Sequence, residues 1–385
     1  MATSEAPGHA ADEPRVTNLE LFFDLVFVFA ITQVTGLLAA EPTWRGLVRG
    51  LLVLTALWWG WVGFSWLTNT VNPEEGAVRL AVFGVMAALL VASLAVPGAF
   101  GDDALVFGLA YLFVRTLHVV LYDLAARGDP GLRRAVWRLA PGVLVSPVLI
   151  LAAAALDGVA QGALWVVALA IDLLSPVVAG SGGWRLSPGH FAERHGLFII
   201  IALGEAIVAI GAGAAGLHVG PALAVAAVLT LAVAAGMWWA YFDVVALVAE
   251  RRLAQEQGAA RVAMARDSYS YLHLPMVAGI VLFALGVKKV LGHLGDPLHA
   301  VPAVALCGGV ALYLAGHVAF RLRNVHTLNR QRVVALLACL AVIPLATSTA
   351  GLAALACLAG IVVALIAYEA IHLREARRRV RLARA

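Results

Sequence analysis

Charged side chains occur inside stretches of the sequence that are otherwise apolar. Glu20 and Asp24 lie four residues apart in the run LELFFDLVFVFAI, so a helix places both carboxylates on one face. A charge at membrane depth costs at least about 2.5–3.5 kcal/mol, and two neighbouring carboxylates require a cationic partner or a shared proton. The pair therefore predicts a site that binds an ion or a proton, or a buried ion-pair network that only locks helices together.

A second polar stripe offers a candidate partner for these two carboxylates. It consists of Tyr111, Arg115, His118 and Tyr122, at spacings of four, three and four. Such spacings place all four side chains on one face of a helix. His317 follows Tyr313 at a similar spacing later in the chain.

Two further polar groups lie at the starts of apolar segments. The segment SPGHFAERHGLF contains His190 and Glu193 one turn apart, followed by Arg194 and, eleven residues later, Glu205. A His and a Glu at this spacing can supply two metal ligands from one helix face, or can hold lipid headgroups or a loop at the membrane boundary. His273 lies on one face with Arg266 and Tyr269 and precedes Pro275, whose missing N–H can open the backbone.

The elements that position these residues are membrane-spanning helices. The chain has 385 residues, 62% hydrophobic and only 13% charged, against about 45–50% and about 25% in soluble proteins. Apolar runs of roughly 18 residues recur along it, long enough to cross a bilayer. We predict an all-α polytopic membrane protein with twelve transmembrane helices at about 19–39, 45–68, 77–97, 102–125, 139–157, 161–180, 189–213, 219–248, 266–290, 298–321, 330–349 and 352–371.

The distribution of basic residues predicts the orientation. Of the 27 Lys and Arg residues, only Arg45, Arg49, Lys288 and Lys289 lie on the outer side, at the outer ends of their predicted helices. The positive-inside rule therefore places both termini in the cytoplasm. The basic tail 372–385 then lies where it can contact anionic lipid headgroups, which we favour over nucleic acid as a partner.

The two parts of the chain show a weak internal repeat. Trp58 and Trp59 correspond to Trp238 and Trp239; further pairs are His118 with His317, Pro147 with Pro344, and Asp172 with Glu369. Repeats of six helices each predict two parallel halves related by a pseudo-twofold axis along the membrane normal. We expect an N-terminal tail (1–18), a first half (19–180), a second half (181–371) and the basic tail (372–385).

Motifs for nucleotide-driven transport and for common hydrolases are missing from the sequence. It contains no P-loop, no HExxH and no GxSxG, and Cys307, Cys339 and Cys357 form no CxxC. No cofactor can be named from these residues. The tryptophans at positions 58, 59, 61 and 66 fit anchors at the membrane interface, with the lining of a substrate cavity as the alternative.

Three long segments resemble the bacterial low temperature requirement A (LtrA) family. They are ELFFDLVFVFAITQV, HFAERHGLFIIIALGEAIVAIG and RDSYSYLHLPMVAGIVLFALG, and the resemblance extends over nearly the whole chain. It implies a multi-pass protein of the bacterial cytoplasmic membrane with a role in growth in the cold, but no reaction or substrate. The family's characteristic polar positions fall on Glu20, Asp24, His190, Glu193, Arg194, Glu205, Arg266, Asp267, Tyr271 and His273.

Two functions remain open at this point, with a channel or membrane sensor as a third. The first is a proton- or ion-coupled secondary transporter of a small molecule, with Asp24 and Glu205 as paired sites between the halves and His118 and His317 as relay or gating groups. The second is an intramembrane enzyme or a metal or haem protein acting on a lipid or other apolar substrate. It would use the group His190, Glu193 and His273. Either protein could form a homo-oligomer.

Overall fold

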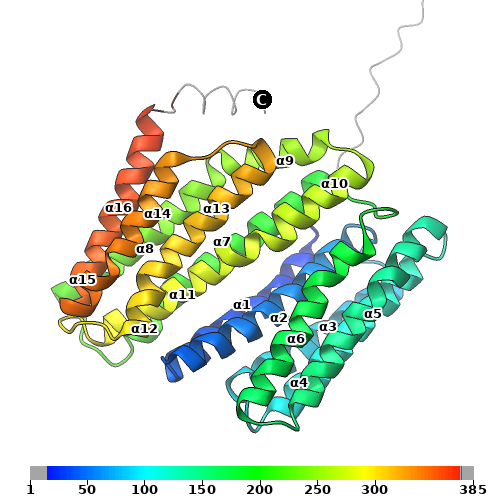
Figure 1. The fold of residues 1–385 in the computed structure, drawn as a ribbon, viewed down its shortest axis with the longest axis horizontal. Coiled ribbons are helices and arrows are strands. Elements are labelled where there is room, and N and C mark those ends of the chain that lie inside the picture. Colours follow the sequence, from blue (N-terminus) through cyan, green and yellow to red (C-terminus); the bar gives the residue numbers. More distant parts are fainter. Residues whose placement is uncertain (1–14, 373, 375–385) are drawn as a thin grey trace, which may run out of the picture.

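The computed structural model describes residues 15–372 and residue 374, and every element in this part of the chain is helical (Figure 1). Twelve helical segments within these residues are long and apolar enough to cross a membrane. The predicted all-α membrane protein with twelve spans is therefore confirmed. Large apolar side chains remain exposed on the outer helices, Leu80, Val178 and Val228 among them, as a bilayer requires.

The first group of helices contains α1 (Asn18–Ala40), α2 (Trp44–Thr68), α3 (Gly76–Leu94), the short turn η1 (Val96–Gly98), α4 (Ala104–Ala125), α5 (Pro130–Ala153) and α6 (Gly158–Ala179). Helix α1 begins with a capping box: the hydroxyl of Thr17 accepts from the N–H of Glu20, whose carboxylate accepts from the N–H of Thr17. Glu20 therefore contributes to the start of α1 as well as to the site described below.

The second group contains α7 (Pro188–Gly213), α8 (Pro221–Phe242), α9 (Val245–Gln255), α10 (Gly258–Met264), a π-helical segment η2 (Ala265–Tyr271), α11 (His273–Gly292), α12 (Ala300–Ala303), a second π-helical segment η3 (Val304–Gly308), α13 (Gly309–Val325), α14 (Arg330–Ala341), α15 (Ile343–Ser348) and α16 (Gly351–His372). The π-helical segment η2 ends just before His273 and Pro275. It widens the helix at the point where the sequence suggested a break.

Two predicted helix boundaries were wrong. Helix α5 begins at Pro130 rather than near residue 139, because Asp129 caps it by accepting from the N–H groups of Gly131 and Leu132. The predicted helix 219–248 ends at Phe242, and the charged segment after it forms the short helices α9 and α10. At the start of α5 charged residues hid the helical pattern from a hydropathy argument, whereas an amphipathic helix within the charged segment 250–266 was expected.

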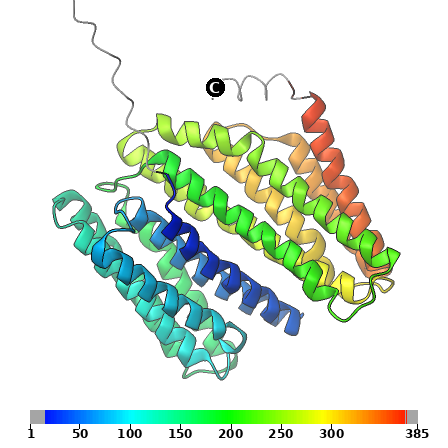
Figure 2. The ribbon, with the colours of Figure 1, turned by 180° about the vertical axis from the view of Figure 1, so that it is seen from behind.

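The two groups meet along α1, α7 and α11. Helix α1 packs against α7 and α11, and α2 also reaches both of them (Figures 1 and 2). In the first group α1 packs on α2 and α3, α3 on α4, and α2 on α6; in the second, α7 packs on α8 and α11, α11 on α13, and α8 on α16. The boundary between the groups therefore passes through the helices that carry most of the predicted site residues.

Helices α11 and α13 approach each other closely through two glycines. A Cβ atom on Gly279 would lie 2.5 Å from the carbonyl oxygen of Gly309, and one on Gly309 would lie 2.6 Å from that of Gly279. Small residues at such crossings let membrane helices pack backbone to backbone. This contact holds α11, the central helix of the second group, in place.

We expect Gly279→Ala to lower the free energy of unfolding by about 1–3 kcal/mol, the usual cost of overpacking. Gly84→Ala, in α3, is the matched control, because a Cβ at that position meets no atom within 4 Å. Unfolding of both variants in detergent, followed by tryptophan fluorescence, measures the difference. Equal stability of the two variants would contradict the close crossing.

Candidate functional site

One arginine joins the two carboxylates of α1 across the boundary between the groups. The Nη1 atom of Arg194, on α7, donates to Oε1 of Glu20 at 2.7 Å, and its Nη2 atom donates to Oδ1 of Asp24 at 2.8 Å. The prediction that the stripe on α4 supplies this partner was wrong. Sequence spacing shows which residues share a helix face but not which helix lies opposite.

His190, one turn before Arg194 on α7, completes this group. Its Nε2 atom lies 3.1 Å from Oε2 of Glu20, and its Nδ1 atom lies 2.9 Å from Nδ2 of Asn69. Oδ1 of Asn69 accepts from the N–H of Ser187, which orients the amide so that its Nδ2 faces the imidazole. An amide nitrogen can only donate, so Nδ1 of His190 accepts and the neutral ring carries its proton on Nε2, towards Glu20.

We call Glu20, Asp24, His190 and Arg194 the interface cluster. All four are buried, with exposed fractions of 2%, 1%, 4% and 0%. Two carboxylates face one guanidinium, so the cluster carries one net negative charge while His190 is neutral. Trp61 donates to Oδ1 of Asp24 at 2.8 Å, whereas Oδ2 of Asp24 has no hydrogen-bond partner among the described residues. The cluster can therefore take up one proton and become neutral.

Glu205 lies on the same boundary but does not pair with Asp24. It follows Arg194 by eleven residues on α7, about 16 Å further along the helix. Its Oε2 atom accepts from the hydroxyl of Thr32 on α1 at 2.7 Å, and its Oε1 atom lies 3.6 Å from Nζ of Lys288 on α11. We call Thr32, Glu205 and Lys288 the second contact. Asp24 and Glu205 therefore belong to two separate polar groups along the same helix boundary.

The stripe on α4 serves contacts within the first group of helices. Nη2 of Arg115 pairs with Oδ1 of Asp172 on α6 at 2.6 Å, and its Nη1 atom donates to the carbonyl of Trp59 at 2.9 Å. The hydroxyl of Tyr122 donates to the carbonyl of Trp66 at 3.0 Å. The ring of His118 is buried, yet neither ring nitrogen has a hydrogen-bond partner in the described part of the chain.

His317 belongs to a comparable group within the second set of helices. Arg332, on α14, makes two hydrogen bonds to Glu369 on α16, at 2.8 and 2.9 Å, and its Nη1 atom lies 3.0 Å from Nδ1 of His317. It also donates to the carbonyl of Ala240 at 3.1 Å. The sequence argument missed Arg332, although a basic residue inside the predicted span 330–349 was the available signal.

The remaining candidates lie apart from the interface cluster. Asp267 pairs with Arg266 at 2.7 Å and with Arg323 at 3.0 Å, and the hydroxyl of Tyr271 donates to the carbonyl of Leu173. His273 donates from Nδ1 to the carbonyl of Ser268 at 3.0 Å and accepts from the hydroxyl of Tyr241 at 2.8 Å; Glu193 accepts from the N–H of Val16 at 3.4 Å.

Of the proposed enzyme group, His190 and Glu193 line one cavity with Tyr241, whose hydroxyl contacts His273. Each of the three also has hydrogen-bond partners of its own. Across residues 15–372 and residue 374, His, Cys, Asp and Glu side chains form no group of three or more that could hold a metal ion.

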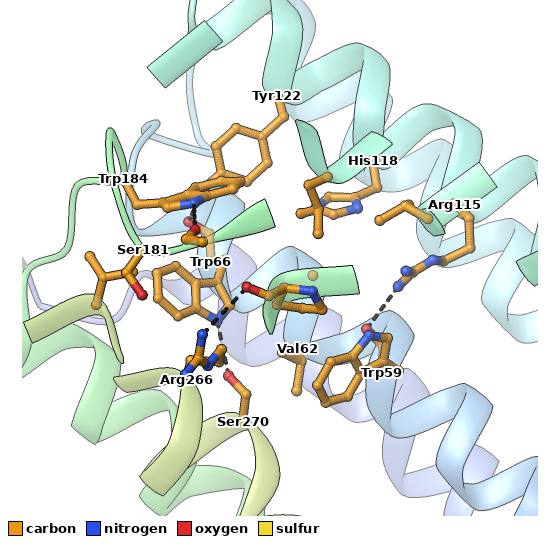
Figure 3. A pocket seen from close by; sticks show the side chains of 16 residues that line it. Trp59, Val62, Trp66, Arg115, His118, Tyr122, Ser181, Trp184, Arg266 and Ser270 are labelled. Atoms are coloured by element: carbon orange, nitrogen blue, oxygen red, sulfur yellow. Dashed lines mark hydrogen bonds between the residues drawn. The ribbon is translucent and has the colours of Figure 1, made fainter. Parts of the chain in front are cut away.

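Three of the tryptophans predicted as membrane anchors lie inside the protein. Trp58, Trp59 and Trp61 are buried, and Trp61 belongs to the hydrogen bonds of the interface cluster. Trp59 and Trp66 line a cavity together with His118 (Figure 3). The cavity-lining alternative for the tryptophans thus fits Trp59 and Trp66 in this structure.

Comparison with known proteins gives two matches. Residues 15–367 match the family model described as bacterial low temperature requirement A protein (LtrA). A protein of Rhizobium meliloti, described as uncharacterized, is 31% identical over 321 residues, which cover 79% of this chain and 76% of that protein. No solved structure matches this chain.

Proposed function

This chain belongs to the bacterial low temperature requirement A family, and we propose that it is a proton-coupled secondary transporter whose coupling proton binds at the interface cluster. The observation that carries the proposal is the position of Arg194. It lies on α7 and holds two carboxylates of α1, so these ion pairs join the two groups of helices. The proposal includes the cytoplasmic membrane as location and the parallel six-helix repeat predicted from the sequence. The shared packing order of the two groups supports that repeat.

Protonation of a carboxylate in the cluster weakens the ion pairs that join α1 to α7. A transporter that rocks one half against the other must separate α1 from α7 whenever that side opens. Leaving a buried charge without its partner costs about 3–5 kcal/mol. A proton on Asp24 removes one of the charges that Arg194 binds and lowers the cost of separation. Opening and proton uptake are then linked, because the two conformations differ in their affinity for the proton.

A proton fits this cluster better than a metal cation. The guanidinium of Arg194 contacts both carboxylates and repels a second cation at the same place. A proton needs no coordination space and can bind at Oδ2 of Asp24, which has no partner among the described residues. The one net negative charge of the cluster matches one coupling proton.

The second contact holds α1 against α7 at the end of the boundary opposite to the interface cluster. Thr32 and Glu205 join α1 to α7 nearer the side predicted to be external, and Lys288 adds α11. Alternating access requires one closure on each side of a central site. In this proposal the interface cluster and the second contact are the closures of the two sides.

A rapid pH change applied to the protein in solid-supported membranes tests the proposal. We expect a transient current as protons bind, and we expect Asp24→Asn to reduce it at least about tenfold, because Asn cannot take up a proton. Asp296→Asn is the control, since that carboxylate lies in a loop with its side chain 73% exposed. Equal currents for Asp24→Asn and the unmodified protein, with both eluting as folded particles, would disprove proton coupling at this site.

A further inference from the structure

A cavity lies between α2, α4, α5 and α6 of the first group and the segments α10 and η2 of the second (Figure 3). Its volume is about 70 Å³. A single water molecule needs about 10–15 Å³ on this measure, so the cavity has room for several waters or for one small ring. Its aromatic lining residues are Trp59, Trp66, Tyr122 and Trp184. A flat, apolar ligand body fits such walls.

The polar groups of the cavity are mainly donors or cations. Arg115 and Arg266 line it, and none of the described lining residues is acidic. Nε of Arg115 has no hydrogen-bond partner among the described residues. An arginine nitrogen cannot accept a hydrogen bond, so it requires an acceptor atom from a ligand or from water.

The imidazole of His118 is a second polar group of the cavity without hydrogen-bond partners among the described residues. Its ring is 3% exposed and packs against Gly63, where a Cβ atom would lie 2.9 Å from Cε1 of the imidazole. The rings of Phe64 and Tyr122 hold it from two further sides, with centroids 5.4 and 5.7 Å away. The ring is thus fixed in orientation, although both nitrogens lack partners in the described residues. Buried polar groups normally have partners, so these nitrogens require water or a bound molecule.

We propose that this cavity binds a small aromatic carboxylate. The aromatic ring of the ligand would lie among the tryptophans and Tyr122, and its carboxylate would accept from Arg115 and His118. Arg115 and Arg266 already pair with Asp172 and Asp267, so the carboxylate is favoured by the hydrogen bonds that Nε of Arg115 and His118 can donate. The mainly apolar walls favour a ring over a short aliphatic acid. This site is separate from the interface cluster, and the proposal holds whether or not the protein couples transport to protons.

Calorimetric titration of the full chain in lipid nanodiscs tests the site with benzoate, phenylacetate and indole-3-acetate as probes. We expect at least one to bind, and the alcohol of the same shape, such as benzyl alcohol for benzoate, to bind at least about tenfold more weakly. A factor of ten corresponds to the loss of one ordinary hydrogen bond. His118→Phe, which keeps the ring but removes both nitrogens, should weaken the carboxylate by a similar factor.

A matched pair of variants on α5 controls for location. Val143 lines the cavity, whereas Val145 is 44% exposed on the same helix. We expect Val143→Phe to fill the cavity and abolish binding and Val145→Phe to leave it unchanged. Failure of all three acids to bind, equal binding of the alcohols, or unchanged binding to Val143→Phe would each overturn the proposal. Unaltered pH-driven currents in Val143→Phe would leave the coupling site and this binding site clearly distinguished.

Discussion

Replacing Arg194 with methionine is expected to lower the free energy of unfolding by about 3–5 kcal/mol. The variant leaves Glu20 and Asp24 as two buried carboxylates without their shared cation, which is the costly way to break a buried ion pair. Unfolding in detergent, followed by fluorescence or by calorimetry, measures the loss. Arg185→Met is the control: its side chain is 73% exposed and also pairs with a carboxylate, so we expect a change within about 1 kcal/mol.

A neutral version of the cluster separates stability from coupling. Combining Arg194→Met with Glu20→Gln and Asp24→Asn removes the unpaired charges, and neutral replacement of a whole buried network often costs little. We expect this triple variant to recover most of the lost stability yet to give no pH-driven current. If Arg194→Met proves as mild as Arg185→Met, the cluster is exposed to water and our reading of it is wrong.

Arg332→Met is expected to lower the free energy of unfolding by a similar amount, about 3–5 kcal/mol, because it breaks a different buried network. Both carboxylate oxygens of Glu369, Nδ1 of His317 and the carbonyl of Ala240 lose a donor together. Arg330→Met, two residues earlier on α14 and exposed, is the matched control. The same unfolding assay in detergent compares the two variants.

A double-mutant cycle tests whether Glu369 accounts for this cost. The free energy of unfolding is measured for Arg332→Met, for Glu369→Gln and for the double variant. Residues in one buried network normally show interaction energies of about 0.5–3 kcal/mol. We expect a value in the upper part of that range because the guanidinium contacts both oxygens. A coupling near zero would mean that the two side chains act independently, against the contacts described.

The sequence predicted the helices better than it predicted their neighbours. Twelve spans follow from the length of apolar runs, and a need for partners follows from carboxylates within them. Glu20 and Arg194, however, are 174 residues apart, and no local pattern shows that α1 lies against α7. Arg115 was therefore offered as the partner, although it pairs with Asp172 within its own group.

The parts of the site that escaped prediction depend on three-dimensional packing. Arg332 stands near the start of its helix among other basic residues, where a basic side chain normally faces lipid headgroups. The cavity beside His118 is lined by residues from six helical segments, so no single stretch of sequence contains it. Asn69 fixes the proton of His190 from a loop, a contact that only the folded chain brings about.

The long separation within the interface cluster has a consequence for biosynthesis. At about 5–20 residues per second, a ribosome needs roughly 10–35 s to extend the chain from Glu20 to Arg194. During this time Glu20 is partly satisfied by its own capping box, and Asp24 gains the N–H of Trp61 once α2 has been made. We therefore expect the carboxylates of α1 to be protonated or in contact with water until the seventh span has been made.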